Sequence, residues 1–289
     1  MVRDYYKNTE VELSSSNDFD KDAHVLTIKK GELNEMISEY DKEISLSSFK
    51  PQRSLNELVW DGDTLKSEIR LRLLDIADDF IDTLNVDWAE PVDVILTGSL
   101  ANYNWSEFSD FDLHVLMDFR DVDEKTEFVK EYFNGKKKEW NENHNNLKIY
   151  NFPVELYVQD VNEPHAASGV YSLYQNKWMT KPSPEKIKPI KIDKFFIKDK
   201  SLDIIEKIEH IINSVENETD KHKLEKLSNK IEVMIKRLRL MRKNGLQKSG
   251  EMNPDNIVYK VLRRLGFLDK IYDARNTCYD KINSIGLCI

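Results

Sequence analysis

Two acidic residues two positions apart, Asp110 and Asp112, stand at the start of a segment whose apolar and polar residues alternate up to Met117. Such alternation predicts a strand, and because successive side chains of a strand point to opposite faces, both carboxylates share one face. Carboxylates placed this way repel each other unless a cation lies between them. Mg²⁺ and Mn²⁺ prefer oxygen ligands, so the pair predicts a site for a hard divalent metal.

A third carboxylate, Glu155, lies in the apolar segment 153–158. A charge is expensive inside an apolar strand without a partner. If this strand pairs beside the segment that begins at Asp110, Glu155 completes a cage of three carboxylates. Such a cage holds two metal ions about 4 Å apart, which stabilises the attacking and the leaving oxygen in phosphoryl transfer.

A Gly98-Ser99 pair ends the β-rich run that begins at Pro91. Glycine permits a tight turn and the close approach of a ligand, and we expect a helix to begin here. The free N–H groups of a helix start would then point at a phosphate, with the Ser99 hydroxyl as a further donor. Gly-Ser pairs are common in turns and Asp-x-Asp is common in loops, so the order of these motifs along the chain carries the argument.

The order Gly98-Ser99, then Asp110-x-Asp112, then a distant Glu155 resembles the DNA polymerase beta-like nucleotidyltransferase superfamily. That superfamily includes poly(A) polymerases, CCA-adding enzymes, oligoadenylate and cyclic-dinucleotide synthases, and small antitoxin-type nucleotidyltransferases. The resemblance covers residues 92–160, and the segment 158–178 is similar to predicted nucleotidyltransferases of phage and bacterial genomes. Many relatives carry Arg-Gly after Gly-Ser, where this chain has Asn102-Tyr103.

The resemblance implies a role for each residue of the pattern. Asp110 and Asp112 would bind two Mg²⁺ or Mn²⁺ ions, and Glu155 would hold the ion that activates the acceptor hydroxyl and help to take its proton. Gly98 and Ser99 would hold the β- and γ-phosphates of an NTP. The acceptor oxygen would attack the α-phosphate and pyrophosphate would leave, so catalysis would depend mainly on positioning and charge neutralisation.

Further candidates for nucleotide binding are a serine, an aromatic residue and a lysine: Ser109, Tyr171 and Lys137. Lys137 is the centre of a triple lysine that could grip phosphate or RNA, or else form a solvated basic turn. Tyr171 opens an aromatic series with Tyr174 and Trp178 that could stack on a base, or else belong to a helix core. His114 alternates onto the face of the two aspartates.

Charge is divided unevenly along the chain. Residues 61–180 contain 11 Lys+Arg against 24 Asp+Glu, whereas residues 181–289 contain 24 against 16. An acidic, metal-attracting half beside a basic half favours a polyanionic partner, and RNA is the acceptor that we expect. The basic residues that flank a predicted apolar helical stripe are Lys230, Lys236, Arg237, Arg239, Arg242 and Lys243, with Arg263 and Arg264 further on. A solvated basic face is the alternative.

Periodicity predicts an α+β fold, a mixed sheet flanked by helices and followed by a helical C-terminal domain. The boundaries expected are an N-terminal extension over 1–50, a nucleotidyltransferase-type domain over 51–180, a linker over 181–200 and a helical domain with a basic face over 201–289. A helix is expected over 63–84, with Asp63 as its N-cap, and another over 121–133, ending near Gly135. A short helix is also expected over 32–44. The expected strands are 24–29, 91–97, 110–117, 147–150 and 154–158.

Several classes are disfavoured. The N-terminus has no apolar run of a signal peptide, and no segment approaches the about 18 apolar residues of a membrane span. Two cysteines, Cys278 and Cys288, predict neither a disulfide framework nor a zinc site, so we expect a cytoplasmic protein.

Other functions remain compatible with the same motifs. The acceptor could be a second nucleotide, a small molecule or a protein instead of RNA. The protein could also be a non-catalytic nucleotide or RNA binder, or a nuclease.

Overall fold

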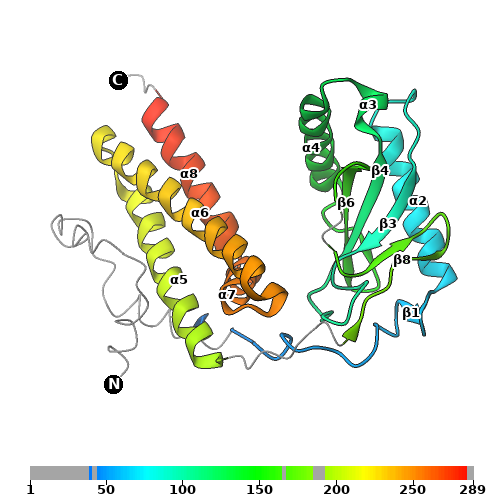
Figure 1. Ribbon diagram of the computed structural model, residues 1–289. Helices are drawn as coiled ribbons and strands as arrows, with labels where there is room; N and C mark the ends of the chain where they lie inside the picture. The colour runs from blue at the N-terminus through cyan, green and yellow to red at the C-terminus, as the bar shows by residue number, and fades with distance from the viewer. Residues whose placement is uncertain (1–38, 41–43, 165–166, 185–192, 285–289) are drawn as a thin grey trace. The chain divides into compact units, whose positions relative to one another are not determined.

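The computed structural model describes residues 39–40, 44–164, 167–184 and 193–284. These residues form two compact units: residues 45–184 contain a sheet, and residues 193–284 together with Glu39, Tyr40 and Ile44 are helical (Figure 1). None of the described helices is long and apolar enough to cross a membrane. The predicted strand 24–29 and most of the predicted helix 32–44 lie outside the described residues.

A six-stranded mixed sheet forms the centre of the first unit, with the strand order β5-β6-β4-β3-β7-β8. Its strands are β3 (Asp93–Thr97), β4 (Phe111–Met117), β5 (Lys148–Ile149), β6 (Phe152–Asp160), β7 (Val170–Ser172) and β8 (Lys177–Thr180). Only β4 and β6 are parallel neighbours in this sheet. The predicted α+β class with a mixed sheet is confirmed. The predicted strands 91–97, 110–117, 147–150 and 154–158 correspond to β3, β4, β5 and β6, whereas β7 and β8 were not predicted.

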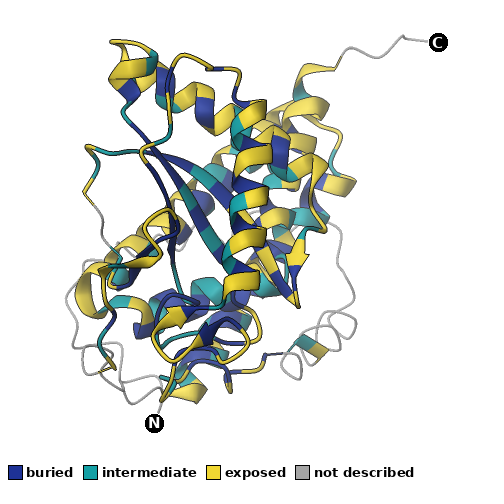
Figure 2. Ribbon diagram, turned by 90° about the vertical axis from the view of Figure 1, so that its right-hand side faces the viewer, coloured by how far each residue is buried: buried dark blue, intermediate teal, exposed yellow. Residues whose placement is uncertain are grey.

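Helices α2 (Ser67–Thr83) and α4 (Thr126–Asn143) share one hydrophobic core with a single face of the sheet. That face presents Phe111 and Leu113 of β4, whereas the opposite face carries Asp112. Phe80 of α2 meets Trp140 of α4 edge to face, with ring centroids 5.4 Å apart. Figure 2 shows largely buried strands beneath helices whose outer faces are exposed. Neither helix therefore covers the face that bears Asp112.

The first predicted helix begins later than expected. Asp63 does not cap it, because Asp63 lies in the turn of a small hairpin formed by β1 (Trp60–Asp61) and β2 (Thr64–Leu65). There its carboxylate pairs with Lys181 and its backbone carbonyl accepts a hydrogen bond from Trp178 Nε1. In the hairpin, the Asp63 carboxylate and carbonyl have Lys181 and Trp178 as partners, which they would lose if the helix began at Asp63.

The helix predicted over 121–133 is two helices. α3 (Phe119–Val122) is capped by Asp118, and α4 continues straight through Gly135 to Asn143. A glycine inside a helix costs about 1 kcal/mol relative to alanine, which does not end a helix whose apolar face is buried. The triple lysine 136–138 is therefore helical and not a turn.

The second unit is a helical bundle. It consists of α5 (Lys194–Asn217), α6 (Lys221–Ser249), the short 3-10 helix η3 (Gly250–Met252), α7 (Pro254–Arg264) and α8 (Phe267–Asn283). The side chains of Asp193, Asp220 and Asn253 accept backbone N–H bonds at the starts of α5, α6 and α7. Gly266, at φ 75°, separates α7 from α8.

Two predicted boundaries are wrong. The segment 181–200 is not linker throughout, because α5 already begins at Lys194. The described part of the extension 1–50 is divided between the units. Tyr40 packs on the helical bundle, its ring 5.0 Å from that of Phe267, whereas Ser45 and the residues after it belong to the sheet unit.

Candidate metal centre

Asp110, Asp112 and Glu155 come together on one face of the sheet. β4 and β6 run parallel with Asp112 directly beside Glu155 in the register, and Asp110 immediately precedes β4. One carboxylate oxygen from each residue can be chosen so that all three atoms lie within 4.8 Å of one another. Three oxygen donors at this separation suit Mg²⁺ or Mn²⁺. The structure thus brings together the three residues predicted as ligands.

The carboxylates differ in exposure. Asp110 and Asp112 are half-buried, whereas Glu155 is exposed. The sequence argument for Glu155 assumed a charge buried in an apolar strand, and that premise is wrong. Val154 and Leu156 face the core under α2 and α4, and Glu155 faces the open side, as alternation requires. A metal site at this position is accessible to a substrate.

Gly98 lies against one of the carboxylates. Its φ is +74°, and a Cβ atom built on it would lie 1.7 Å from Asp112 Oδ2. Real side chains cannot approach so closely, so the backbone at Gly98 and the Asp112 carboxylate occupy space that only glycine leaves free. Thr97, which precedes Gly98, pairs with Asp112 in the register of β3 and β4.

The segment after Gly98 is a series of turns and not the predicted helix. The backbone N–H of Asn102 bonds the carbonyl of Ser99 at 3.1 Å, and no helical continuation follows. The expectation that a helix start presents its N–H groups to phosphate is therefore wrong. What remains at this position is an open turn with a positive-φ glycine and a serine hydroxyl.

Ser109 braces this turn from within. It is buried, and its Oγ accepts bonds from the backbone N–H of Ser106 at 3.0 Å and from Ser99 Oγ at 2.7 Å. The predicted contact of Ser109 with a nucleotide does not fit its burial. Its position instead fixes Ser99, and a serine between Phe108 and Asp110 gave no sequence signal for that role.

A second loop packs on the same turn. A Cβ on Gly169 would lie 2.0 Å from the carbonyl oxygen of Ala101, so the two backbones touch. Asn102 Nδ2 donates to Ser168 Oγ at 2.5 Å, and Asn102 itself is buried. Asn102 thus has a structural role in joining the two loops.

Three residues that the sequence did not single out lie on the same face of the sheet as Asp112: Thr97 and Gln159, which are buried, and Tyr157, which is half-buried. His114 Nδ1 lies 2.7 Å from Gln159 Oε1, and its ring meets that of Tyr157 edge to face at 5.3 Å. The Thr97 hydroxyl is buried and has no hydrogen-bond partner within the described residues. Counting alternate positions from Glu155 would have found Tyr157 and Gln159.

Lys137 lies near this face. Its Nζ is 5.4 Å from the ring centroid of Tyr157, the second residue after Glu155 on β6. Lys136 and Lys138 are instead paired along α4 with Glu139 and Glu142. Of the triple lysine, Lys137 is therefore the member placed towards the strand that carries Glu155.

The predicted stacking of Tyr171 on a base is wrong. Tyr171 is 1% exposed, its ring contacts those of Trp60 and Trp178 edge to face, and its hydroxyl bonds Asn176. Tyr171 on β7 and Trp178 on β8 pack with Trp60 of the β1 hairpin, whereas Tyr174 is 42% exposed in the turn between β7 and β8. The spacing of this aromatic series resembled a helix because spacing alone does not separate buried strands from helices.

Comparison with known proteins gives no match: no family model, no curated protein and no solved structure matches this chain. The geometry of the site therefore carries the functional argument.

Proposed function

We propose that this protein is a metal-dependent nucleotidyltransferase, which transfers a nucleoside monophosphate from an NTP to a hydroxyl group. The observation that carries the proposal is the cluster of Asp110, Asp112 and Glu155, with oxygens within 4.8 Å on neighbouring strands, beside the turn at Gly98. The resemblance of these motifs to the polymerase beta-like superfamily supports it. A nucleotidyltransferase-type sheet with its site on one open face is part of the same proposal.

The residues present fit two Mg²⁺ or Mn²⁺ ions. All three ligands are carboxylates, which these hard cations prefer, and the buried Thr97 Oγ1, opposite Asp112 in the register, is a polar atom with no hydrogen-bond partner among the described residues. Bound there, the metal would neutralise phosphate charge and favour ionisation of the attacking hydroxyl. Asp110 and Asp112 would hold both ions, and Glu155 the one nearer the acceptor.

The chain's own groups account for the rest of the step. The acceptor oxygen forms a bond to the α-phosphorus, and the bond from that phosphorus to the β-phosphate oxygen breaks. Pyrophosphate leaves with the electron pair, and the acceptor proton passes to the exposed carboxylate of Glu155 and on to solvent. Catalysis then depends on holding both reactants in line, which can contribute about 7–11 kcal/mol.

Ser99 is suited to the β- and γ-phosphates. The Ser99 hydroxyl donates to Ser109 Oγ, and because a hydroxyl hydrogen can rotate, it can turn from Ser109 to a phosphate oxygen. The open backbone at Gly98 allows the phosphate to come close. Lys137 would add a positive charge on the side of Tyr157.

RNA is the acceptor that the charge division favours, since residues 181–289 contain 24 Lys+Arg against 16 Asp+Glu. Each α-labelled NTP, incubated with Mg²⁺ or Mn²⁺ and a mixed small-RNA pool, should yield labelled RNA and pyrophosphate. Label in a small product without RNA would identify another acceptor class. The Asp110→Asn variant should transfer no label from NTP, and turnover by that variant would refute the metal site.

A further inference from the structure

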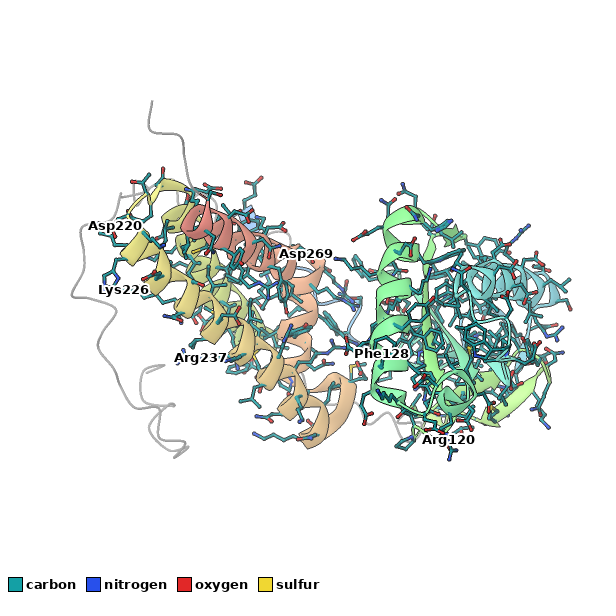
Figure 3. The ribbon with its side chains drawn as sticks, turned by 90° about the horizontal axis from the view of Figure 1, so that it is seen from above. Arg120, Phe128, Asp220, Lys226, Arg237 and Asp269 are labelled. Carbon is teal, nitrogen blue, oxygen red and sulfur yellow. The ribbon has the colours of Figure 1, made fainter. Side chains whose placement is uncertain are left out.

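One face of α6 carries exposed cations at helical spacing. From Lys226 onwards, exposed basic residues recur along the solvent side of the helix, and we call five of them the basic stripe: Lys226, Lys236, Arg237, Lys243 and Lys248. Lys226, Arg237 and Lys248 follow one another at intervals of eleven residues, or about three helical turns, so they lie in one line along the helix. Lys236 and Lys243, seven residues or about two turns apart, form a second line beside it. Figure 3 shows Lys226 and Arg237 projecting from α6.

Most other cations of the helical unit are occupied by the fold. Some hold acidic partners, namely Lys200 with Asp255, Lys207 with Asp203, Lys223 with Glu218, Lys260 with Glu251, Lys270 with Glu209 and Arg275 with Glu232. Others lie over tyrosine rings, as Arg242 does over Tyr259 at 4.9 Å. These residues stabilise the bundle and are not available to bind a separate polyanion.

The basic stripe differs from these cations. Among the described residues, Lys226, Lys236, Arg237, Lys243 and Lys248 have neither an ion pair nor a side-chain hydrogen bond. The acidic residues of α6 are Glu225, which precedes the stripe and lies 3.3 Å from His222, and Glu232, which is paired with Arg275 at 3.9 Å. Helix α4, by contrast, pairs Lys138 with Glu142 on its own surface. A solvated helix ordinarily mixes the two signs, so an unmixed row of positive charge favours a negative partner.

The stripe is also long and straight. At 1.5 Å per residue, Lys226 and Lys248 lie roughly 33 Å apart along the axis, enough for several consecutive phosphates. Two exposed apolar residues, Val233 (47%) and Leu240 (56%), stand within the same face and can contact sugars and base edges. No exposed aromatic residue of α6 offers a stacking platform, so recognition there would be of the backbone.

We propose that the basic stripe of α6 binds the phosphate backbone of a nucleic acid strand independently of its sequence. The claim that this strand is the nucleotidyl acceptor rests on the proposed function, whereas the binding does not. The contacts are electrostatic, so log K should fall with log salt at a slope of about −0.7 per contacted phosphate of a single strand.

The test measures binding of a fluorescent mixed-sequence RNA strand to the full chain by anisotropy, without NTP or metal. The variant Lys236→Gln/Arg237→Gln/Lys243→Gln removes three stripe charges. We expect about a hundredfold weaker binding near 0.1 M salt and a salt slope shallower by about 2. A control, Arg72→Gln/Lys138→Gln/Lys207→Gln, removes the same residue types from exposed positions with acidic helix neighbours.

The control triple should bind almost as the unaltered chain does. Equal losses in both triples would show an effect of net charge alone and overturn the stripe, as would unchanged binding by the stripe variant. Tighter binding to phosphatidylserine vesicles than to RNA, lost in the stripe variant, would assign the surface to a membrane and also overturn the proposal. Parallel measurements with single- and double-stranded RNA and DNA identify the preferred strand.

Failure of the proposed function gives a different result. The Asp110→Asn variant should bind RNA normally and transfer no nucleotide. If the unaltered chain binds RNA through the stripe but turns over no NTP, the stripe stands and the proposed function falls. If it labels RNA with no loss in the stripe variant, the proposed function stands and the stripe falls.

Discussion

The carboxylate of Asp112 lies against the Cα of Gly98, so closely that a Cβ on Gly98 would be 1.7 Å from Asp112 Oδ2. The two residues come from the end of β3 and the start of β4, which pair antiparallel with Thr97 opposite Asp112. The backbone of Gly98 therefore borders the candidate metal centre directly. The absence of a side chain at residue 98 fixes where the Asp112 carboxylate can lie.

Gly98→Ala should displace Asp112 and destabilise the sheet unit. The positive φ alone costs about 1 kcal/mol, and the overlap with a carboxylate adds to it, so we expect a total of about 2–4 kcal/mol. All five tryptophans lie within residues 60–178, so tryptophan fluorescence during urea unfolding reports this unit.

Gly62→Ala is the matched control. Gly62 also has positive φ, at +58°, but a Cβ there meets nothing within 4 Å. It should cost about 1 kcal/mol and leave metal binding intact. Equal destabilisation by both substitutions would mean that the contact between Gly98 and Asp112 carries no energy of its own.

Mn²⁺ should stabilise the unaltered chain and not the Asp112→Asn variant. Binding to the folded state alone contributes about 1.4 kcal/mol at ten times Kd, which should raise the Tm of the sheet unit by about 4 °C. Each protein is compared with its own Tm without metal, so any change in stability caused by the substitution itself does not enter the shift. A similar Mn²⁺ shift in both proteins would place the ion elsewhere.

Ser99→Ala and Ser109→Ala should separate the binding of the NTP phosphates from the stabilisation of the turn at Gly98. Ser109→Ala leaves the backbone N–H of buried Ser106 without its acceptor, at a cost of about 1–3 kcal/mol. Ser99→Ala loses only the bond to Ser109 and should cost less than about 1 kcal/mol, but raise the KM for NTP. An unchanged KM in Ser99→Ala would remove Ser99 from the phosphate site.

Lys270→Met should destabilise the helical unit in a pH-dependent way. Burial alone lowers the pKa of Lys270, but hydrogen bonds to Glu209 and Tyr40 outweigh it and raise that pKa above its usual value. A raised folded-state pKa contributes stability below the unfolded value, about 10.4, that is lost as pH rises through the folded pKa. The difference between parent and variant, about 1 kcal/mol at pH 8, should therefore shrink above pH ~10.4.

Far-UV circular dichroism follows this helical unit, while tryptophan fluorescence should stay unchanged. Lys207→Met serves as the control, because Lys207 pairs with Asp203 on the exposed surface of α5 and should cost less than about 0.5 kcal/mol at any pH. A pH-independent loss in Lys270→Met would show that packing over Phe267, and not the charge, holds the lysine.

Local patterns determined a large part of this protein. Alternation along 110–117 placed Asp110 and Asp112 on one face, and three-and-four spacing placed the apolar stripes of α2 and α6. Such periods follow from backbone geometry alone, so they can be derived without knowing any partner. The same rule, applied to 154–158, gave the correct strand but an incorrect argument for Glu155.

Contacts between distant segments were decided by the tertiary structure alone. That Glu155 lies beside Asp112, that Gly98 touches Asp112, and that Tyr171 is enclosed by Trp60 depend on which strands pair and in what register. Register results from the summed burial of whole faces, which no single segment encodes. For the same reason the sequence showed the basic residues of α6, but only the packed bundle separated those with partners from the exposed row.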